Sequence, residues 1–118
     1  MVAIKRIDKT NIDHKLVIQL IREIKIQKFL NHPNIVKLYT FFSDERYIYL
    51  VMELCTSGQL YGFLRKKRKL NEDLAKVILK DTLKALDYMH EREIIHRDLK
   101  PENIIYHYVI NFNNIRAW

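Results

Sequence analysis

The sequence has little cysteine, little glycine and no long hydrophobic run, and each shortage excludes a class of protein. A single cysteine, Cys55, among 118 residues excludes an internal disulfide and a thiolate metal cluster, and it favours a reducing compartment. Two glycines, Gly58 and Gly62, leave no glycine-rich phosphate-binding loop. No apolar run reaches the roughly 18 residues of a membrane span, and residues 1–5 have no signal-peptide pattern. We therefore expect no membrane partner and a cytoplasmic or nuclear protein.

Positive charge is in excess, with a formal net charge of +7. The densest cluster is a run of five consecutive cations, Arg65, Lys66, Lys67, Arg68 and Lys69. Such a run is usually a solvated helix end and loop, while a nuclear-localisation signal or a polyanion-binding patch remains the alternative. No aromatic residues that stack on bases are interleaved with it, so we expect no nucleic-acid partner. The hydrophobic fraction of 48% and charged fraction of 30% are typical of a globular domain.

Hydrophobic periodicity predicts alternating strands and helices. Strands are expected at 2–7, 35–42 and 47–52, where β-branched and aromatic residues concentrate, with a polar turn at 43–46. Helices are expected after Asp13, over 59–68 and from the capping residue Asn71 to His90. In the first helix a spacing of three and four predicts one buried stripe, consisting of Val17, Leu20, Ile21, Ile24, Phe29 and Leu30. The small and polar residues of 53–58 are the best candidate for a hinge.

Residues 96–103, HRDLKPEN, place a carboxylate, two cations and an amide in one short loop. This stretch resembles the catalytic loop of eukaryotic protein kinases, and Lys100 two places after Asp98 is the serine/threonine variant. The resemblance, closest to aurora-like and neighbouring groups, implies that Asp98 is the base that accepts the substrate hydroxyl proton and that Lys100 neutralises the γ-phosphoryl oxygens. Asn103 would be a ligand of Mg²⁺. His96 is expected to be a packed structural residue of the loop.

The resemblance extends upstream to an ATP site. The stretch VAIK at 2–5 is similar to the third strand of the kinase small lobe, whose lysine, here Lys5, binds the α- and β-phosphates of ATP. Glu23 would form the ion pair that fixes this lysine, as active kinases require. The cofactor contacts implied by the family are Ala3, Lys5, Met52, Glu53, Cys55 and Ile105. Met52 would be the gatekeeper, and Glu53 and Cys55 would bond adenine through their backbones.

The implied fold class is α+β, a partial bilobal protein-kinase fold of three small-lobe strands with one helix, a hinge, two large-lobe helices and the catalytic loop. The small lobe would comprise 1–53, and the hinge and the start of the large lobe 54–106. The remainder, 107–118, has no recognisable kinase motif, so the match ends near residue 105. Nothing in the sequence covers the apolar face of the helix at 71–90, and an exposed hydrophobic patch is expected there.

The sequence departs from the family where it lacks the glycine-rich loop and the Asp-Phe-Gly motif, whose aspartate holds magnesium. We therefore interpret it as a truncated serine/threonine kinase domain that is inactive or weak as it stands. It would descend from an active enzyme that transfers the γ-phosphate of ATP to a protein Ser/Thr hydroxyl. Glu102 suggests substrates with a basic motif, and Arg97 suggests activation by phosphorylation. The alternatives are a pseudokinase-like binding module with a regulatory protein partner and, as a third interpretation, a basic nucleic-acid binder. The segment 107–118 is a divergent end, a splice product or translated noncoding sequence.

Overall fold

The computed structural model describes the backbone of residues 1–109 and 112–117 and the side chains of residues 1–105. The chain divides into two units. The first comprises Met1–Asn31 and Lys37–Leu54, and the second comprises His32–Val36 and Cys55–Trp118. Among the described helices, none is long and apolar enough to cross a membrane.

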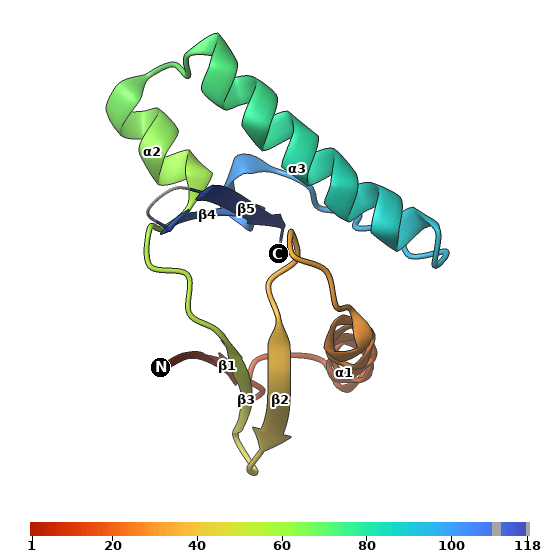
Figure 1. Ribbon diagram of the computed structural model, residues 1–118. Coiled ribbons are helices and arrows are strands. Elements are labelled where there is room, and N and C mark those ends of the chain that lie inside the picture. The colour runs from red at the N-terminus through yellow and green to blue at the C-terminus, as the bar shows by residue number, and fades with distance from the viewer. Residues whose placement is uncertain (110–111, 118) are drawn as a thin grey trace. The chain divides into compact units, whose positions relative to one another are not determined.

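The first unit contains a three-stranded antiparallel sheet in the order β1-β3-β2 (Figure 1). The strands are β1 (Val2–Asp8), β2 (Leu38–Ser43) and β3 (Tyr47–Glu53). The apolar residues Ile48, Leu50 and Met52 alternate along β3 and are all buried, as expected for a strand with one face toward a core. The two strands that flank β3 pair with it along their lengths, so β3 sets the register of the whole sheet.

Two sequence expectations, for the second strand and for the first helix, are wrong. β2 begins at Leu38 rather than at Ile35, because the amide of Ile35 bonds the carbonyl of His32 at 3.0 Å in a turn before the strand. Helix α1 (His14–Phe29) buries Ile24, but Phe29 is 84% exposed. Five residues beyond Ile24, Phe29 lies about 140° around the helix axis and so falls outside the stripe. Asp13 is the N-cap residue, as expected, yet its side chain makes no capping bond.

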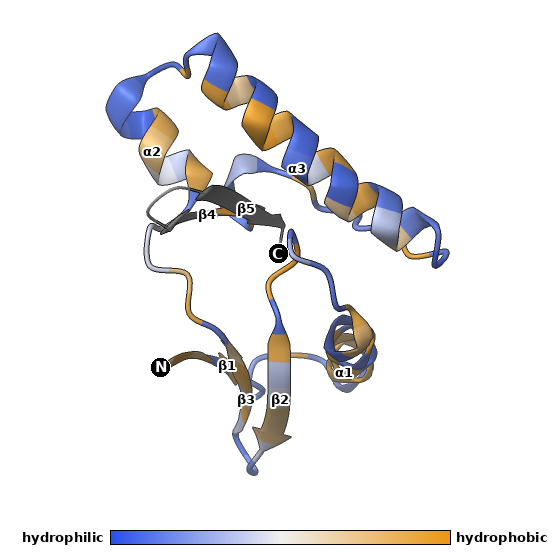
Figure 2. Ribbon diagram, viewed as in Figure 1, coloured by the Kyte–Doolittle hydropathy of each residue, from blue (hydrophilic) through white to orange (hydrophobic). Residues whose placement is uncertain are grey.

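The second unit begins with two helices, α2 (Leu60–Lys67) and α3 (Glu72–His90). The side chain of Asn71 accepts a hydrogen bond from the amide of Leu74 at 2.8 Å, which confirms the predicted N-cap. Hydrophobic residues recur along α3 (Figure 2). Its inward side packs in a small core that joins the two helices to the strand after the loop, consisting of Leu60, Ile78 and Ile104 with Leu64, Leu70 and Leu74 against them. Through Ile104 this core anchors the C-terminal end of the 91–103 loop.

The loop leads through a short 3₁₀ helix (Pro101–Asn103) into a hairpin of β4 (Ile104–Val109) and β5 (Phe112–Ala117). The two strands pair from Ile104 with Ala117 to Val109 with Phe112. Residues 104–106 therefore begin a hairpin. The elements confirm the predicted α+β class, with three strands and one helix before the hinge and two helices before the loop.

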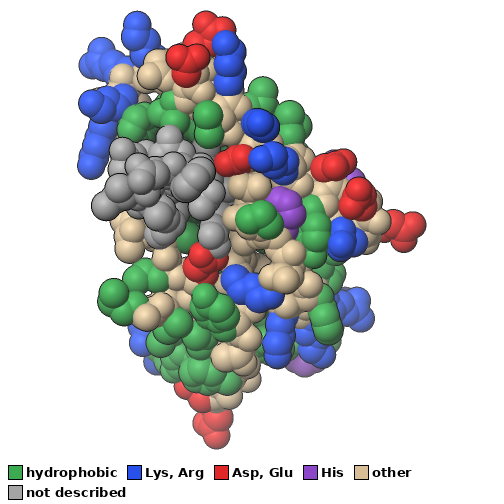
Figure 3. Space-filling view, viewed as in Figure 1, with side chains coloured by type: hydrophobic (Ala, Val, Ile, Leu, Met, Phe, Trp, Pro, Cys, Tyr) green, Lys and Arg blue, Asp and Glu red, His purple; other side chains and the backbone are tan. Residues whose placement is uncertain are grey.

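The basic run lies at the end of α2. Arg65, Lys66 and Lys67 form the last helical turn, and Arg68 caps it in the left-handed conformation with φ 62°. Lys and Arg side chains gather there in Figure 3, at the upper left, and all five cations are exposed. Cations at a helix C-terminus are favoured by the helix dipole, so this arrangement agrees with the solvated helix end expected from the sequence.

Candidate active site

The loop that follows α3 contains two non-glycine residues with positive φ. Glu93 has φ 59° and Arg97 has φ 66°. L-residues other than Asn and Asp adopt this region rarely, and such strain concentrates at functional sites. Arg97 directly precedes Asp98, so the strained backbone at Arg97 helps to set the direction in which the Asp98 side chain points.

Three side chains hold Asp98. Lys100 Nζ lies 3.0 Å from Asp98 Oδ2, and Asn103 Nδ2 donates to the same oxygen at 2.9 Å and to the Asp98 carbonyl at 2.8 Å. His96 Nδ1 accepts a hydrogen bond from the Asp98 amide at 3.3 Å, which confirms its expected structural role. Because both side-chain donors converge on Oδ2, Oδ1 is the oxygen positioned to accept a proton from a hydroxyl.

The same donors set the charge of Asp98. The hydrogen bond from Lys100, followed by that from Asn103, lowers the pKa of the Asp98 carboxyl below its ordinary value, and partial desolvation opposes them only in part. The carboxyl is therefore ionised at neutral pH. An ionised, exposed carboxylate can orient a hydroxyl and take its proton late in a transfer.

The sequence explains why Asn103 reaches back to Asp98. Lys100 precedes proline and is extended, with φ −157° and ψ 161°, as the residue before proline prefers. Pro101 then opens the 3₁₀ helix, where its missing amide costs nothing, and the amide of Asn103 bonds the Lys100 carbonyl at 2.8 Å. This turn folds Asn103 onto the aspartate five positions earlier.

Asn103 fits one role as a cation ligand. Its Nδ2 is occupied by Asp98, so Oδ1 is the end of the amide available to a hard cation such as Mg²⁺. Within the part of the chain that the structure describes, no group of three or more His, Cys, Asp or Glu side chains could hold a metal. Mg²⁺ in phosphoryl-transfer sites usually takes some of its ligands from substrate phosphates and water, and Asn103 as a single protein ligand agrees with that binding mode.

The first unit brings the predicted strand residues onto one face of its sheet. Lys5 pairs across the ladder with Leu50, and Ala3 pairs with Met52, so these four side chains share a face. Lys5 is exposed as a residue, yet desolvation by its surroundings lowers the pKa of its amine. The face thus presents a cation beside apolar residues, an arrangement suited to a ligand with an apolar ring and a phosphate tail.

Glu23 lies on α1 of the same unit. Its carboxylate, exposed on α1, accepts a hydrogen bond from Gln19 Nε2 one turn earlier on the same helix, at 3.2 Å. The ion pair expected between Glu23 and Lys5 stays a prediction.

The remaining predicted cofactor residues occur at element ends. Glu53 ends β3, and its amide donates to the Lys37 carbonyl at 2.9 Å while its Oε2 accepts from the Lys37 amide at 3.3 Å. Cys55, half-buried, begins the part of the chain assigned to the second unit, where Ile105 bridges to Gln59. The adenine contacts expected of these residues stay predictions.

The sequence analysis missed two features. Asn103 was expected only as a metal ligand, whereas its amide nitrogen also holds Asp98 in place. His32 packs against Tyr88 of α3 with the two rings tilted and 4.9 Å between their centroids, and it accepts a hydrogen bond from the Asn34 amide at 3.0 Å. Burial, followed by the nearby Lys84 and Arg92, lowers the pKa of His32, which favours this neutral acceptor form. The sequence around His32 and Pro33 predicted only a turn and gave no signal that His32 would contact Tyr88, which is distant in the sequence.

Comparison with known proteins agrees with this geometry. The family model of the protein kinase domain matches residues 1–115, which extends beyond the end near residue 105 that the motifs predicted. The chain is 44% identical over 113 residues to an Aurora kinase of Eremothecium gossypii, covering 95% of this chain and 30% of that protein. It is 48% identical over 104 residues to calcium-dependent protein kinase 5 of Plasmodium berghei, covering 88% and 18%.

Aurora kinase B of Mus musculus is 43% identical over 100 residues, covering 85% of this chain and 28% of that protein. The chain therefore spans less than a third of the length of these relatives. The match includes the strand of Lys5, the helix of Glu23 and the loop of Asp98. On this match, the chain belongs to the protein kinase domain family.

Proposed function

We propose that this chain supplies the nucleotide-binding strand and the catalytic loop of a serine/threonine protein kinase, which transfers the γ-phosphoryl group of ATP to a protein hydroxyl. The observation that carries the proposal is the convergence of Lys100 and Asn103 on one oxygen of Asp98. Phosphoryl transfer requires positioning and charge neutralisation more than covalent chemistry, and this loop provides both. Asp98 orients the hydroxyl and takes its proton, and Lys100 compensates charge on the transferring group.

Nucleotide binding is assigned to the face of β1 and β3 and to the hinge. Lys5 pairs with the α- and β-phosphates, Ala3 and Met52 contact adenine, and backbone groups of Glu53 and Cys55 bond its edge, with Ile105 as a further contact. The lowered pKa of Lys5 and its apolar neighbours on the sheet support this assignment. When bound, Mg²⁺ neutralises phosphate charge, and Asn103 Oδ1 is the ligand that this chain offers to it.

We propose further that these 118 residues alone transfer phosphate weakly or not at all. With two glycines, they contain no glycine-rich loop to enclose the phosphates, and they contain no Asp-Phe-Gly aspartate to hold the metal.

A second candidate function is a non-catalytic binding module, which the lack of a glycine-rich loop and of an Asp-Phe-Gly motif in these 118 residues favours. Such a module would use the kinase surface to engage a regulatory protein, in the cytoplasm or nucleus, without turnover. Protein substrates with a Ser or Thr hydroxyl, selected through a basic motif of their own that Glu102 attracts, belong to the first candidate only. A measurement of nucleotide binding at Lys5 distinguishes the two candidate functions.

The test is labelling by an ATP analogue whose terminal phosphate carries an acyl group. A lysine amine that lies beside the bound phosphates attacks the acyl carbonyl, forms an amide and releases the nucleotide. We expect mass spectrometry to find the acyl group on Lys5 and Lys100 and to find less of it when ATP is added first. Lys76 and Lys80 on α3 are exposed controls. Labelling of Lys5 no faster than these controls, or unaffected by ATP, would exclude the proposed nucleotide site.

A further inference from the structure

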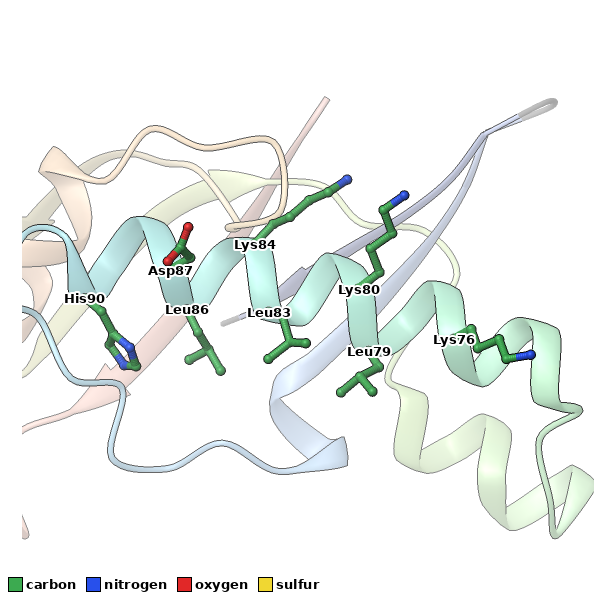
Figure 4. A pocket seen from close by; sticks show the side chains of 8 residues that line it. All are labelled: Lys76, Leu79, Lys80, Leu83, Lys84, Leu86, Asp87 and His90. Carbon is green, nitrogen blue, oxygen red and sulfur yellow. The ribbon is translucent and has the colours of Figure 1, made fainter.

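Two exposed surfaces of the second unit have no role in the proposed site. The first is the hydrophobic patch that the sequence predicted on α3, where Leu79 is 59% exposed and Leu83 is 54% exposed beside an open groove (Figure 4). Nothing among the described residues shows what covers this patch. The second surface is the basic run at the end of α2, residues 65–69, and the charges around that run indicate the kind of ligand it binds.

No neighbouring acid neutralises the basic run. All five of its side chains are exposed, and α2 itself contains no acidic residue. On α3 of the same unit, by contrast, Lys76 pairs with Glu72 at 3.2 Å and Lys84 pairs with Asp81 at 3.4 Å. No ion pair among the described residues includes a member of the run. The run thus presents five unpaired cations in a chain whose net charge is +7.

The exposure of the run follows from its own chemistry. Burying a charged group without a partner is costly, so each of these side chains either stays in water or meets an anion. This holds whatever other surface lies nearby, which is not true of an apolar patch. Consecutive helical residues point about 100° apart, so the cations of the last turn surround the helix end (Figure 3). Cations at this spacing repel one another, and a bound anion relieves that repulsion.

The acids near the run do not change the sign of this surface. Glu72 and Asp73 are exposed in the first turn of α3, where the helix dipole favours them, and Glu72 is already paired with Lys76. Glu102, half-buried, lies in the 3₁₀ helix that contacts α2. These three carboxylates are fewer than the five cations of the run. The end of α2 therefore stays positive and selects an anionic ligand.

The place of α2 beside the catalytic loop favours a peptide as that ligand. Leu60, the first residue of α2, packs in the small core with Ile104. Ile104 directly follows Asn103, whose amide holds Asp98. From Leu60 to Lys67 the helix extends about 10 Å, a distance that an extended peptide covers in about three residues. A peptide whose hydroxyl lies at Asp98 can therefore place residues a few positions away beside the run.

We propose that the basic run binds an acidic segment of the protein substrate, a few residues from the hydroxyl that Asp98 orients. The inference rests on the proposed function, because it takes Asp98 as the place of the hydroxyl. A protein segment is favoured over nucleic acid, since no aromatic residues that stack on bases are interleaved with the run. Glu102 attracts a cation of the same substrate, so the expected substrate carries charges of both signs at different positions.

Fluorescence anisotropy with labelled peptides tests this binding without requiring turnover. Three peptides share a central serine and differ only in one flank, which consists of four glutamates, four glutamines or four lysines. We expect the glutamate peptide to bind the folded chain at least about tenfold more tightly than the other two, and to lose affinity as salt rises from about 50 to 300 mM. A glutamine peptide that binds equally tightly would overturn the proposal.

Two triple variants separate the run from the charge of the whole chain. The first neutralises the last turn of α2 by Arg65→Gln, Lys66→Gln and Lys67→Gln. The matched control neutralises one arginine and two lysines that are exposed on α1, by Lys15→Gln, Arg22→Gln and Lys25→Gln. The first variant should weaken binding of the glutamate peptide about tenfold, because it removes three exposed ion pairs, and the control should stay within about twofold of wild type. Equal losses would overturn the proposal, and circular dichroism checks that both variants are folded.

A duplex DNA oligonucleotide tests the choice of a protein ligand. Tighter binding of this DNA than of the glutamate peptide at about 150 mM salt, lost in the first triple variant, would overturn that choice.

Photo-crosslinking tests the position of the bound peptide. The central serine of the glutamate peptide is replaced by benzoylphenylalanine, and mass spectrometry identifies where it attaches. We expect attachment within residues 96–103, and attachment only outside this loop would overturn the assignment to a substrate. Labelling of Lys5 by the acylating ATP analogue does not involve the run. A failure of the peptide tests with Lys5 labelling intact would therefore refute this inference and leave the proposed function standing.

Discussion

Replacing Leu50 by alanine tests the packing beneath the nucleotide-binding face. Leu50 is 2% exposed in β3 and is the cross-strand partner of Lys5. Deleting a buried leucine side chain to alanine removes its transfer free energy and leaves a cavity, at a cost of about 2.7–5 kcal/mol. Domains of this size are stable by only about 5–15 kcal/mol, so the loss is a large part of the total. At about 3–5 °C per kcal/mol, the melting temperature should fall by roughly 10–20 °C.

The assay is thermal and urea unfolding followed by circular dichroism, with Leu16→Ala as the control. Leu16 is the same residue type in the same unit and is 55% exposed, so its truncation should cost less than about 1 kcal/mol. The comparison isolates burial from the change of residue. Equal losses of stability in the two variants would refute the assignment of Leu50 to the core that supports Lys5.

Three further predictions follow from single contacts. Lys100→Met should raise the pKa of Asp98, because it removes the donor that contributes most to the lowering, and an NMR titration that shows no rise would contradict this geometry. The pKa of Asp8 is lowered from 3.8 to about 2, so its contribution to stability is complete above pH 3.8 and is lost as the pH falls through about 2; Asp8→Asn should remove this dependence from urea midpoints measured between pH 4.5 and 2 or so. Asn71→Ala should cost about 1 kcal/mol in urea unfolding, whereas Asp13→Ala, at an N-cap without a side-chain bond, should cost less, and the opposite order would contradict the capping assignment.

Most of the fold could be predicted from local patterns. The strand of Lys5, the α3 helix and its Asn71 cap follow from periodicity and capping chemistry, which depend on residues close together in the chain. The loop residues 96–103 were recognisable because several specific residue types occur at fixed spacing in one stretch. Such local signals can be recognised without knowledge of tertiary contacts.

The failures arise where distant contacts or side-chain orientation decide. The first residues predicted for β2 form a turn instead, in which the Ile35 amide bonds the His32 carbonyl, and His32 itself packs against the ring of Tyr88. The positive φ of Arg97 has no sequence signal either, because arginine has no preference for that region.

The central claim is that the groups around Lys5 and Asp98 constitute a kinase nucleotide site and catalytic loop. Calorimetric titration of the folded chain with ATP and magnesium, beside Lys5→Met and Asp98→Asn, tests it most directly. We expect saturable, magnesium-dependent binding that Lys5→Met weakens and Asp98→Asn largely spares, since the proposed function assigns Lys5 to the phosphates and Asp98 to the substrate hydroxyl. No binding by a chain that circular dichroism shows to be folded, or equal loss in both variants, would contradict it.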